Sequence, residues 1–281
     1  MTWYQALILG VVQGASEFLP ISSSAHLVLV PWLLGWQLEA HPFFLFSVSV
    51  HWGTLAAVVA IFRSDLLRFG RAALQALVHR NLLETPEATL GWLLVLASLP
   101  GALGGIVLGG VVEQAFTNPP AVAGLLLGTA GLLALGERSR SIRAANPGEF
   151  RVLESLRTQD ALLIGLAQAV ALLPGISRSG ATISAGLFRG LDRVDAVRFS
   201  FLMSVPIIFG AGLVALTDLA GGPGAAEFLP SLAIGFLSAG IVGFFAIRWL
   251  IRTLAGSTFW GFAAYCAALG AAGLLVSLIR G

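Results

Sequence analysis

The sequence of 281 residues has no lysine, a single cysteine and few charged residues of either sign. Only 11% of its residues are charged, whereas an average soluble domain has about 25%. Because 57% of the residues are hydrophobic, we exclude an ordinary soluble protein and expect a chain that crosses a membrane several times. The one cysteine, Cys266, excludes an intrachain disulfide and a metal centre built from cysteines.

Long apolar stretches account for most of the chain. A helix needs about 20 apolar residues to span a bilayer, and six stretches qualify: 42–62, 89–110, 119–136, 199–219, 228–252 and 258–279. Regions 3–36 and 161–190 each contain two shorter apolar pieces, split by proline and serine, and we interpret each as a re-entrant helix–loop–helix hairpin. The expected fold is an all-α polytopic integral membrane protein with one membrane domain over 1–281.

The basic residues, all arginine, indicate how the chain is oriented. They gather in segments 63–88, 137–160 and 189–198, which the predicted spans place on one side of the membrane. The positive-inside rule makes that side the cytoplasm. Hairpin 3–36 then enters from outside, and hairpin 161–190 enters from the cytoplasm. Since this arginine pattern reports topology, we expect no nucleic-acid partner.

Two segments of the chain resemble each other at a constant offset of 155 residues. Residues 6–24 and 161–179 are identical at seven of nineteen positions. Each is followed by three predicted spans, an odd number, so the two halves should have opposite orientation. We predict an inverted-topology repeat, with residues 1–136 as the first half, 161–281 as the second and 137–160 as a cytoplasmic connecting loop.

The end of the first hairpin helix carries polar residues at membrane depth, where they mark functional sites by default. Gln13 and Glu17 are four residues apart and share one helix face. Ser22, Ser23 and Ser24 follow, and then His26. A helix start with free N–H groups can bind an anion. Helix capping by the serines and an interhelical hydrogen bond by Gln13 are the alternatives.

The second hairpin has a different polar set after Pro174 and Gly175. Ser177, Arg178 and Ser179 precede a helix, and Thr182 follows in its first turn. A guanidinium, hydroxyls and backbone N–H groups can converge on phosphate oxygens, although Thr182 could also serve only in helix packing. Together the two tips favour hydrolysis of a lipid-linked phosphate, in which positioning and charge stabilisation carry the catalysis.

These residues also carry a family resemblance. QGASEFLPISSSAH (13–26) and PGISRSGAT (174–182) resemble the two signature motifs of the bacterial undecaprenyl-diphosphate phosphatases, the bacitracin-resistance family, and the similarity covers nearly the whole chain. Ala25 and Ser47 depart from the family's usual glycine and acid. The resemblance implies a hydrolase in the bacterial inner membrane that regenerates the lipid carrier of cell-wall synthesis, with its site open to the outer, periplasmic face.

The resemblance also implies roles for individual residues. The expected catalytic residues are Glu17, Ser23, His26 and Arg178, and the expected phosphate-binding residues are Gln13, Ser22, Ser24, Ser177, Arg178, Ser179 and Thr182. Ser23 is the preferred nucleophile, ahead of a water molecule and of histidine, with His26 and Glu17 as proton-transfer partners. His51 could face the cavity or simply pack.

The same sequence features also fit other functions. Inverted repeats with broken helices are typical of transporters, so the main rival is a transporter or flippase of a lipid phosphate or other anion, and a second is a non-catalytic scaffold. The expected partners are a polyprenyl diphosphate substrate and membrane lipids. A divalent cation, Mg²⁺ or Ca²⁺, could bind at Glu17 and Gln13, and a Gly101–Gly105 motif leaves a homodimer open.

Overall fold

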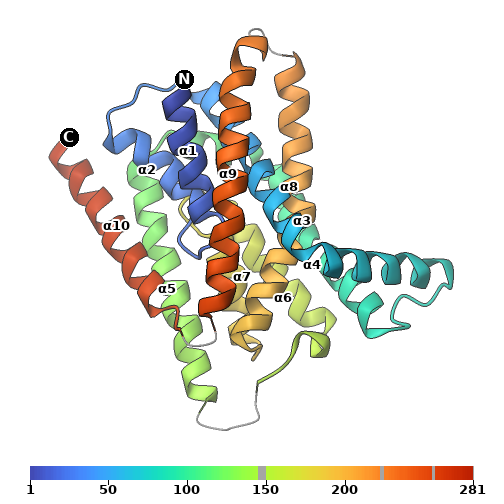
Figure 1. Ribbon diagram of the computed structural model, residues 1–281. Helices are drawn as coiled ribbons and strands as arrows, with labels where there is room; N and C mark the ends of the chain where they lie inside the picture. The colour runs from blue at the N-terminus through green and yellow to red at the C-terminus, as the bar shows by residue number, and fades with distance from the viewer. Residues whose placement is uncertain (145–149, 222–224, 255–256, 281) are drawn as a thin grey trace.

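The computed structural model describes residues 1–144, 150–221, 225–254 and 257–280, and helices dominate them. Figure 1 shows their arrangement. The elements in chain order are α1 (Trp3–Ser16), α2 (Ser23–Leu33), α3 (Ala40–Val78), α4 (Pro86–Ala115), α5 (Pro119–Arg143), a short 3₁₀ turn (Leu153–Ser155), α6 (Thr158–Val170), α7 (Arg178–Phe188), α8 (Arg193–Gly221), α9 (Ala225–Thr253) and α10 (Trp260–Arg280).

Six of these helices are long and apolar enough to cross a membrane, namely α3, α4, α5, α8, α9 and α10. Five of the six predicted spans lie wholly within these helices, and the sixth, 258–279, begins two residues before α10. The prediction of an all-α protein with six apolar helices of spanning length is therefore confirmed. Proline at the first positions of α4 and α5 suits a helix start, because the missing N–H would have no partner there. Thr85 and Asn118 cap these two starts with their side-chain oxygens.

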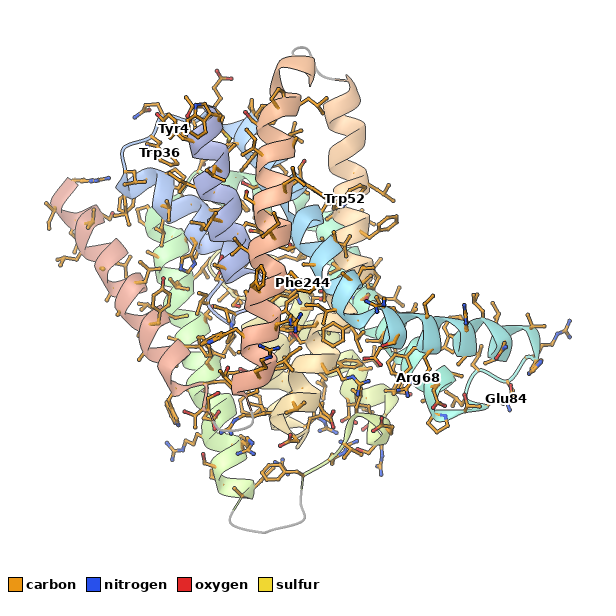
Figure 2. The ribbon with its side chains drawn as sticks, in the orientation of Figure 1. Tyr4, Trp36, Trp52, Arg68, Glu84 and Phe244 are labelled. Atoms are coloured by element: carbon orange, nitrogen blue, oxygen red, sulfur yellow. The ribbon has the colours of Figure 1, made fainter. Side chains whose placement is uncertain are left out.

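Helix α3 differs from the prediction beyond its spanning part. We expected a loop from 63 to 88, but the helix continues to Val78 after a kink at Phe62, where φ is −99° and ψ is 18°. The second part of α3, the loop that follows it and the start of α4 extend sideways as an arm (Figure 1). Figure 2 labels Arg68 and Glu84 on this arm. Phe69 of the arm is buried, so packing favours the helix where charge alone suggested a loop.

Two pairs of short helices, α1–α2 and α6–α7, occupy the two regions predicted as hairpins. Helix α1 packs on α9, and α6 packs on α4. Glycine allows both close crossings: a Cβ at Gly10 would lie 2.6 Å from the Gly235 carbonyl oxygen, and one at Gly165 would lie 2.5 Å from that of Ala97. Gly10 and Gly165 are identical positions of the sequence repeat, so the repeat has a counterpart in packing.

Ion pairs concentrate at the end of the molecule where α5 and α9 finish, the lower end in Figure 1. The Asp160 side chain is fully buried and accepts hydrogen bonds from Arg151 (2.8 Å) and Arg189 (2.6 Å). Burial alone would raise the pKa of this carboxyl, but the hydrogen bonds from the two arginines outweigh it and lower the pKa to about 2. The arginines predicted to face the cytoplasm therefore also stabilise one end of the fold.

Two aromatic residues lie together at the opposite end. Tyr4 and Trp36 lie beside each other near the N-terminus (Figure 2), with ring centroids 6.4 Å apart. Such residues are enriched where a membrane meets water.

In the Gly101–Gly105 motif, Gly101 already packs against Gln168 of the same chain, whereas Gly105 has open space around it.

Candidate active site

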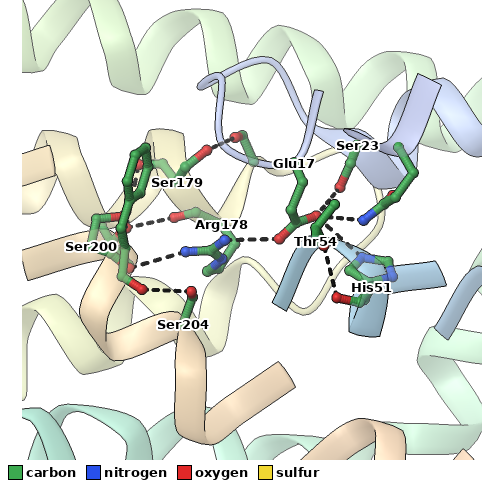
Figure 3. Close-up of polar contacts among 12 residues, drawn as sticks. Glu17, Ser23, His51, Thr54, Arg178, Ser179, Ser200 and Ser204 are labelled. Atoms are coloured by element: carbon green, nitrogen blue, oxygen red, sulfur yellow. Dashed lines mark hydrogen bonds and ion pairs between the residues drawn. The ribbon is translucent and has the colours of Figure 1, made fainter. Parts of the chain in front are cut away.

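The two short-helix pairs meet at their loops, and the contact is an ion pair. Arg178 Nη2 lies 2.8 Å from Glu17 Oε1 (Figure 3). Two further hydrogen bonds join the same loops: the Gly175 N–H donates to Ser24 Oγ at 3.3 Å, and Ser179 Oγ donates to the Leu19 carbonyl at 3.1 Å. Residues about 160 positions apart thus form one polar site inside an apolar bundle.

Four residues converge on the Glu17 carboxylate, whose side chain is only 5% exposed. Besides Arg178 on Oε1, the other oxygen, Oε2, accepts from Ser23 Oγ at 2.6 Å and from Gln13 Nε2 at 3.0 Å. His51 Nε2 of α3 lies 3.3 Å from the same oxygen (Figure 3). Glu17 follows the last residue of α1, and Gln13 lies one helical turn earlier, as the four-residue spacing indicated.

The two terminal nitrogens of Arg178 bind different partners. One, Nη2, pairs with Glu17, while Nη1 donates to the Ser200 carbonyl of α8 at 3.1 Å. Thr182, one turn further along α7, bonds to the Ser200 hydroxyl at 2.7 Å and to the Arg178 carbonyl at 2.8 Å. Helix α8 therefore fixes the guanidinium, and Thr182 contributes to that support.

Four serines of the two loops form equivalent pairs, Ser22 with Ser24 and Ser177 with Ser179, and Ser23 stands apart. Ser22 caps α2 through the Ala25 N–H, and Ser177 caps α7 through the Gly180 N–H. Their hydroxyls also approach those of Ser24 and Ser179, at 3.1 and 3.2 Å. Ser23 is different, because its hydroxyl turns to Glu17. Since helices α2 and α7 both begin here, their N-terminal N–H groups and dipoles favour an anion.

His26, an expected proton-transfer residue, bonds to Ser22 and to Tyr265. Its Nδ1 lies 2.8 Å from the Ser22 carbonyl oxygen, and its Nε2 lies 2.7 Å from the Tyr265 hydroxyl of α10. Its ring stacks on that of Tyr265 with centroids 5.7 Å apart. His26 is buried beside the serine loop, and its two ring nitrogens are occupied by Ser22 and Tyr265.

Three residues of the site were not singled out by the sequence motifs: His51, Ser200 and Tyr265. Each comes from a spanning helix, α3, α8 or α10, and reaches the loops only in the folded chain. His51 carried the one available signal, a histidine inside an apolar stretch, for which packing was the alternative. The structure places it at the carboxylate.

The proposed cation ligands, Gln13 and Glu17, do not fit a resident divalent cation. Both carboxylate oxygens already have partners, among them the Arg178 guanidinium. Gln13 Oε1 is buried without a hydrogen-bond partner, but it would be the only other ligand. Within the described parts of the chain there is no group of three or more His, Cys, Asp or Glu side chains that could hold a metal ion.

A cavity of about 550 Å³ lies between α9 and α10 and reaches the first loop at Ile21, next to Ser22. Tyr265, the hydrogen-bond partner of His26, is part of its wall. The lining is mostly apolar and consists of Ile21, Trp249, Thr253, Ser257, Thr258, Gly261, Phe262 and Tyr265.

Comparison with known proteins shows the family of the chain. Residues 6–272 match the family described as bacitracin resistance protein BacA. The chain is 39% identical to the undecaprenyl-diphosphatase of Desulforudis audaxviator over the full length of both chains. It is 42% identical to the undecaprenyl-diphosphatase of Thermomicrobium roseum over 98% of each chain, and 45% identical to that of Rubrobacter xylanophilus over 95% of each.

Proposed function

The chain belongs to the BacA family, and we propose that the site around Glu17 and Arg178 carries out its undecaprenyl-diphosphatase reaction. The protein is a multi-span membrane enzyme of this family, and its substrate is undecaprenyl diphosphate. One observation supports the location of the site above all others. The Glu17–Arg178 ion pair joins two distant loops, and Ser23 donates to the other oxygen of the same carboxylate.

The diphosphate binds, in our proposal, where helices α2 and α7 begin. Arg178 provides a guanidinium that stays charged at depth, and the N-terminal N–H groups of both helices provide further donors. Ser200 and Thr182 keep the guanidinium in place. The incoming phosphate competes with Glu17 for Arg178, so binding also loosens the carboxylate from its cation.

Ser23 is the proposed nucleophile. Its oxygen attacks the terminal phosphorus while its proton passes to Glu17 Oε2, 2.6 Å away. The bond from that phosphorus to the bridging oxygen breaks, and undecaprenyl phosphate leaves. Water then attacks the phosphoserine, Ser23 recovers its proton from Glu17, and inorganic phosphate is released. The second candidate is direct attack by a water that Ser23 orients.

The polyprenyl tail occupies, in this proposal, the cavity between α9 and α10. The cavity is mostly apolar and reaches Ile21, the residue before the helix cap Ser22, so a tail attached to a phosphate at this loop could enter it directly. Any divalent cation that the reaction uses would arrive on the diphosphate oxygens, since Glu17 and Gln13 do not fit one. A chelator titration with and without substrate tests this point.

We also propose the inverted repeat and its orientation. Packing supports the repeat: α1 on α9 corresponds to α6 on α4, and α3 on α9 corresponds to α8 on α4. Hairpin 3–36 would enter the bacterial inner membrane from outside and hairpin 161–190 from the cytoplasm, so that the arginine-rich end faces the cytoplasm. The site would open to the periplasmic face, which cysteine accessibility at positions 24 and 180 can test.

The function itself is tested by phosphate release from undecaprenyl diphosphate with purified protein in detergent. We expect Glu17→Gln and Arg178→Ala each to lose at least about a hundredfold in turnover, the usual contribution of a general base or a charge-stabilising group. Glu84→Gln is the control, because Glu84 lies on the exposed arm. Substrate binding without turnover in the unaltered protein would instead support the alternative, a transporter of lipid phosphates.

A further inference from the structure

His51 stands at the catalytic carboxylate, although neither motif contains it. Its Nε2 lies 3.3 Å from Glu17 Oε2, on the oxygen that also accepts from Ser23 (Figure 3). Its other ring nitrogen, Nδ1, contacts the backbone carbonyl of Ser47, one turn earlier on α3. Both ring nitrogens are therefore engaged, and the chemistry of the two partners determines which nitrogens carry protons.

A carbonyl oxygen can only accept a hydrogen bond, so Nδ1 of His51 must carry a proton. If the ring were neutral, Nε2 would present a lone pair to a carboxylate that also only accepts. Two lone pairs would then face each other at 3.3 Å. One additional proton between His51 and Glu17 removes this conflict.

The other contacts of Glu17 show on which side that proton lies. Ser23 and Gln13 donate to Oε2, and Arg178 donates to Oε1, so the carboxylate already receives three hydrogen bonds as an acceptor. Such donors favour the ionised carboxylate. The additional proton therefore belongs on His51, which makes it an imidazolium.

His26 provides an internal comparison. Its Nδ1 also faces a carbonyl oxygen, that of Ser22, but its Nε2 faces the Tyr265 hydroxyl, which can donate. A neutral ring satisfies both contacts. The structure thus distinguishes the two histidines, with His26 neutral on Tyr265 and His51 charged on Glu17.

We propose that His51 is a positioning residue whose imidazolium holds Glu17 ionised and directs Oε2 at Ser23. This inference rests on the proposed function, in which Glu17 accepts the Ser23 proton. With Arg178 and His51 both cationic and Glu17 anionic, the three side chains carry a net charge of about +1, which suits a phosphate. Loss of the His51 proton at alkaline pH would remove the fourth donor of Glu17 and slow the reaction.

Among the described residues two charged groups act on His51, the Glu17 carboxylate, which favours the imidazolium, and the Arg178 guanidinium, which opposes it. Arg198 of α8 is paired with Asp65, further along α3. The remaining charged residues with described side chains on the helices packed against α3 are Glu87 and Glu113 of α4, Arg193 and Asp195 of α8, and Arg248 and Arg252 of α9.

Spectroscopy tests the protonation directly and without turnover. In protein labelled with ¹⁵N-histidine, His51→Gln identifies the His51 signals. We expect both His51 nitrogens to be protonated near neutral pH, and Glu17→Gln to convert the ring to the neutral Nδ1–H form. A neutral His51 beside an intact Glu17 would overturn the proposal, whatever the activity of the protein.

Kinetics test the role. His51→Ala should lower kcat about 10- to 100-fold, because a charged acceptor loses a donor. His51→Gln should recover part of this loss, since its amide can donate, but its kcat should no longer fall at alkaline pH. The control is His79→Gln, which alters an exposed His–Glu pair on the arm. A His51→Gln enzyme with the unaltered pH profile would refute the role, whereas absence of phosphate release from the unaltered protein would refute only the proposed function.

Discussion

Replacing Arg178 by lysine separates the shape of the cation from its charge. The guanidinium uses two nitrogens at once, Nη2 on Glu17 at 2.8 Å and Nη1 on the Ser200 carbonyl at 3.1 Å. A lysine ammonium is a single point on a flexible stem and cannot hold both partners while it meets a phosphate. Arg178→Lys should therefore keep the positive charge and lose the fixed orientation.

The size of the effect follows from the bonds lost. One hydrogen bond to a charged group contributes about 1.5–3 kcal/mol, and each 1.36 kcal/mol in the barrier is about a factor of ten in rate. We expect kcat/KM for undecaprenyl diphosphate to fall about 10- to 150-fold in Arg178→Lys, and further in Arg178→Ala. Steady-state phosphate release in detergent measures this.

Arg198→Lys is the matched control for this substitution. Arg198 also makes a two-nitrogen contact, to both oxygens of Asp65 at 3.0 and 2.7 Å, but outside the site. The same chemical change there should lower thermal stability and leave kcat/KM unchanged. If Arg178→Lys retained the unaltered kcat/KM, charge alone would suffice, and the argument from two-nitrogen geometry would be wrong.

Two other predictions concern stability and the lipid tail. The pKa of Asp160 is about 2 in the folded protein and 3.8 ordinarily, so its contribution to the free energy of unfolding is present above about pH 4 and lost as pH falls toward 2. Asp160→Asn should lower the thermal midpoint at neutral pH and weaken this acid dependence; an unchanged midpoint would contradict it. Gly261→Leu, where an added side chain meets open space in the cavity, should raise KM for undecaprenyl diphosphate more than for farnesyl diphosphate. Gly131→Leu, at another open position, is its control, and equal effects on the two substrates would argue against a tail in the cavity.

Hydropathy sufficed to predict the six spanning helices and the two pairs of short helices, because an apolar run of a given length has few other solutions in a membrane. It failed for residues 63–78, where charges suggested a loop and the chain forms the arm of α3. The helix there depends on the burial of Phe69, a tertiary contact that composition does not report.

The sequence named most side chains of the site but not their partners. Glu17, Ser23 and Arg178 were identified and do meet. His26 was expected to transfer protons together with Glu17; its ring bonds to Tyr265, while the histidine beside the carboxylate is His51. Sequence separation carries no information about which spanning helix passes a given loop.

The Glu17–Arg178 ion pair also explains why the two repeated segments differ at the positions of these two residues. Glu17 aligns with Leu172 and Ser23 with Arg178, so each copy holds a charge that the other lacks. A lone charge at membrane depth is costly. Here Glu17 and Arg178 compensate each other's charge once the two loops pack together. In the proposed mechanism this ion pair opens, because the diphosphate binds Arg178. If that mechanism holds, the divided site couples assembly of the two halves to formation of the carboxylate that accepts the Ser23 proton, and the substrate anion is the group that replaces Glu17 on the guanidinium.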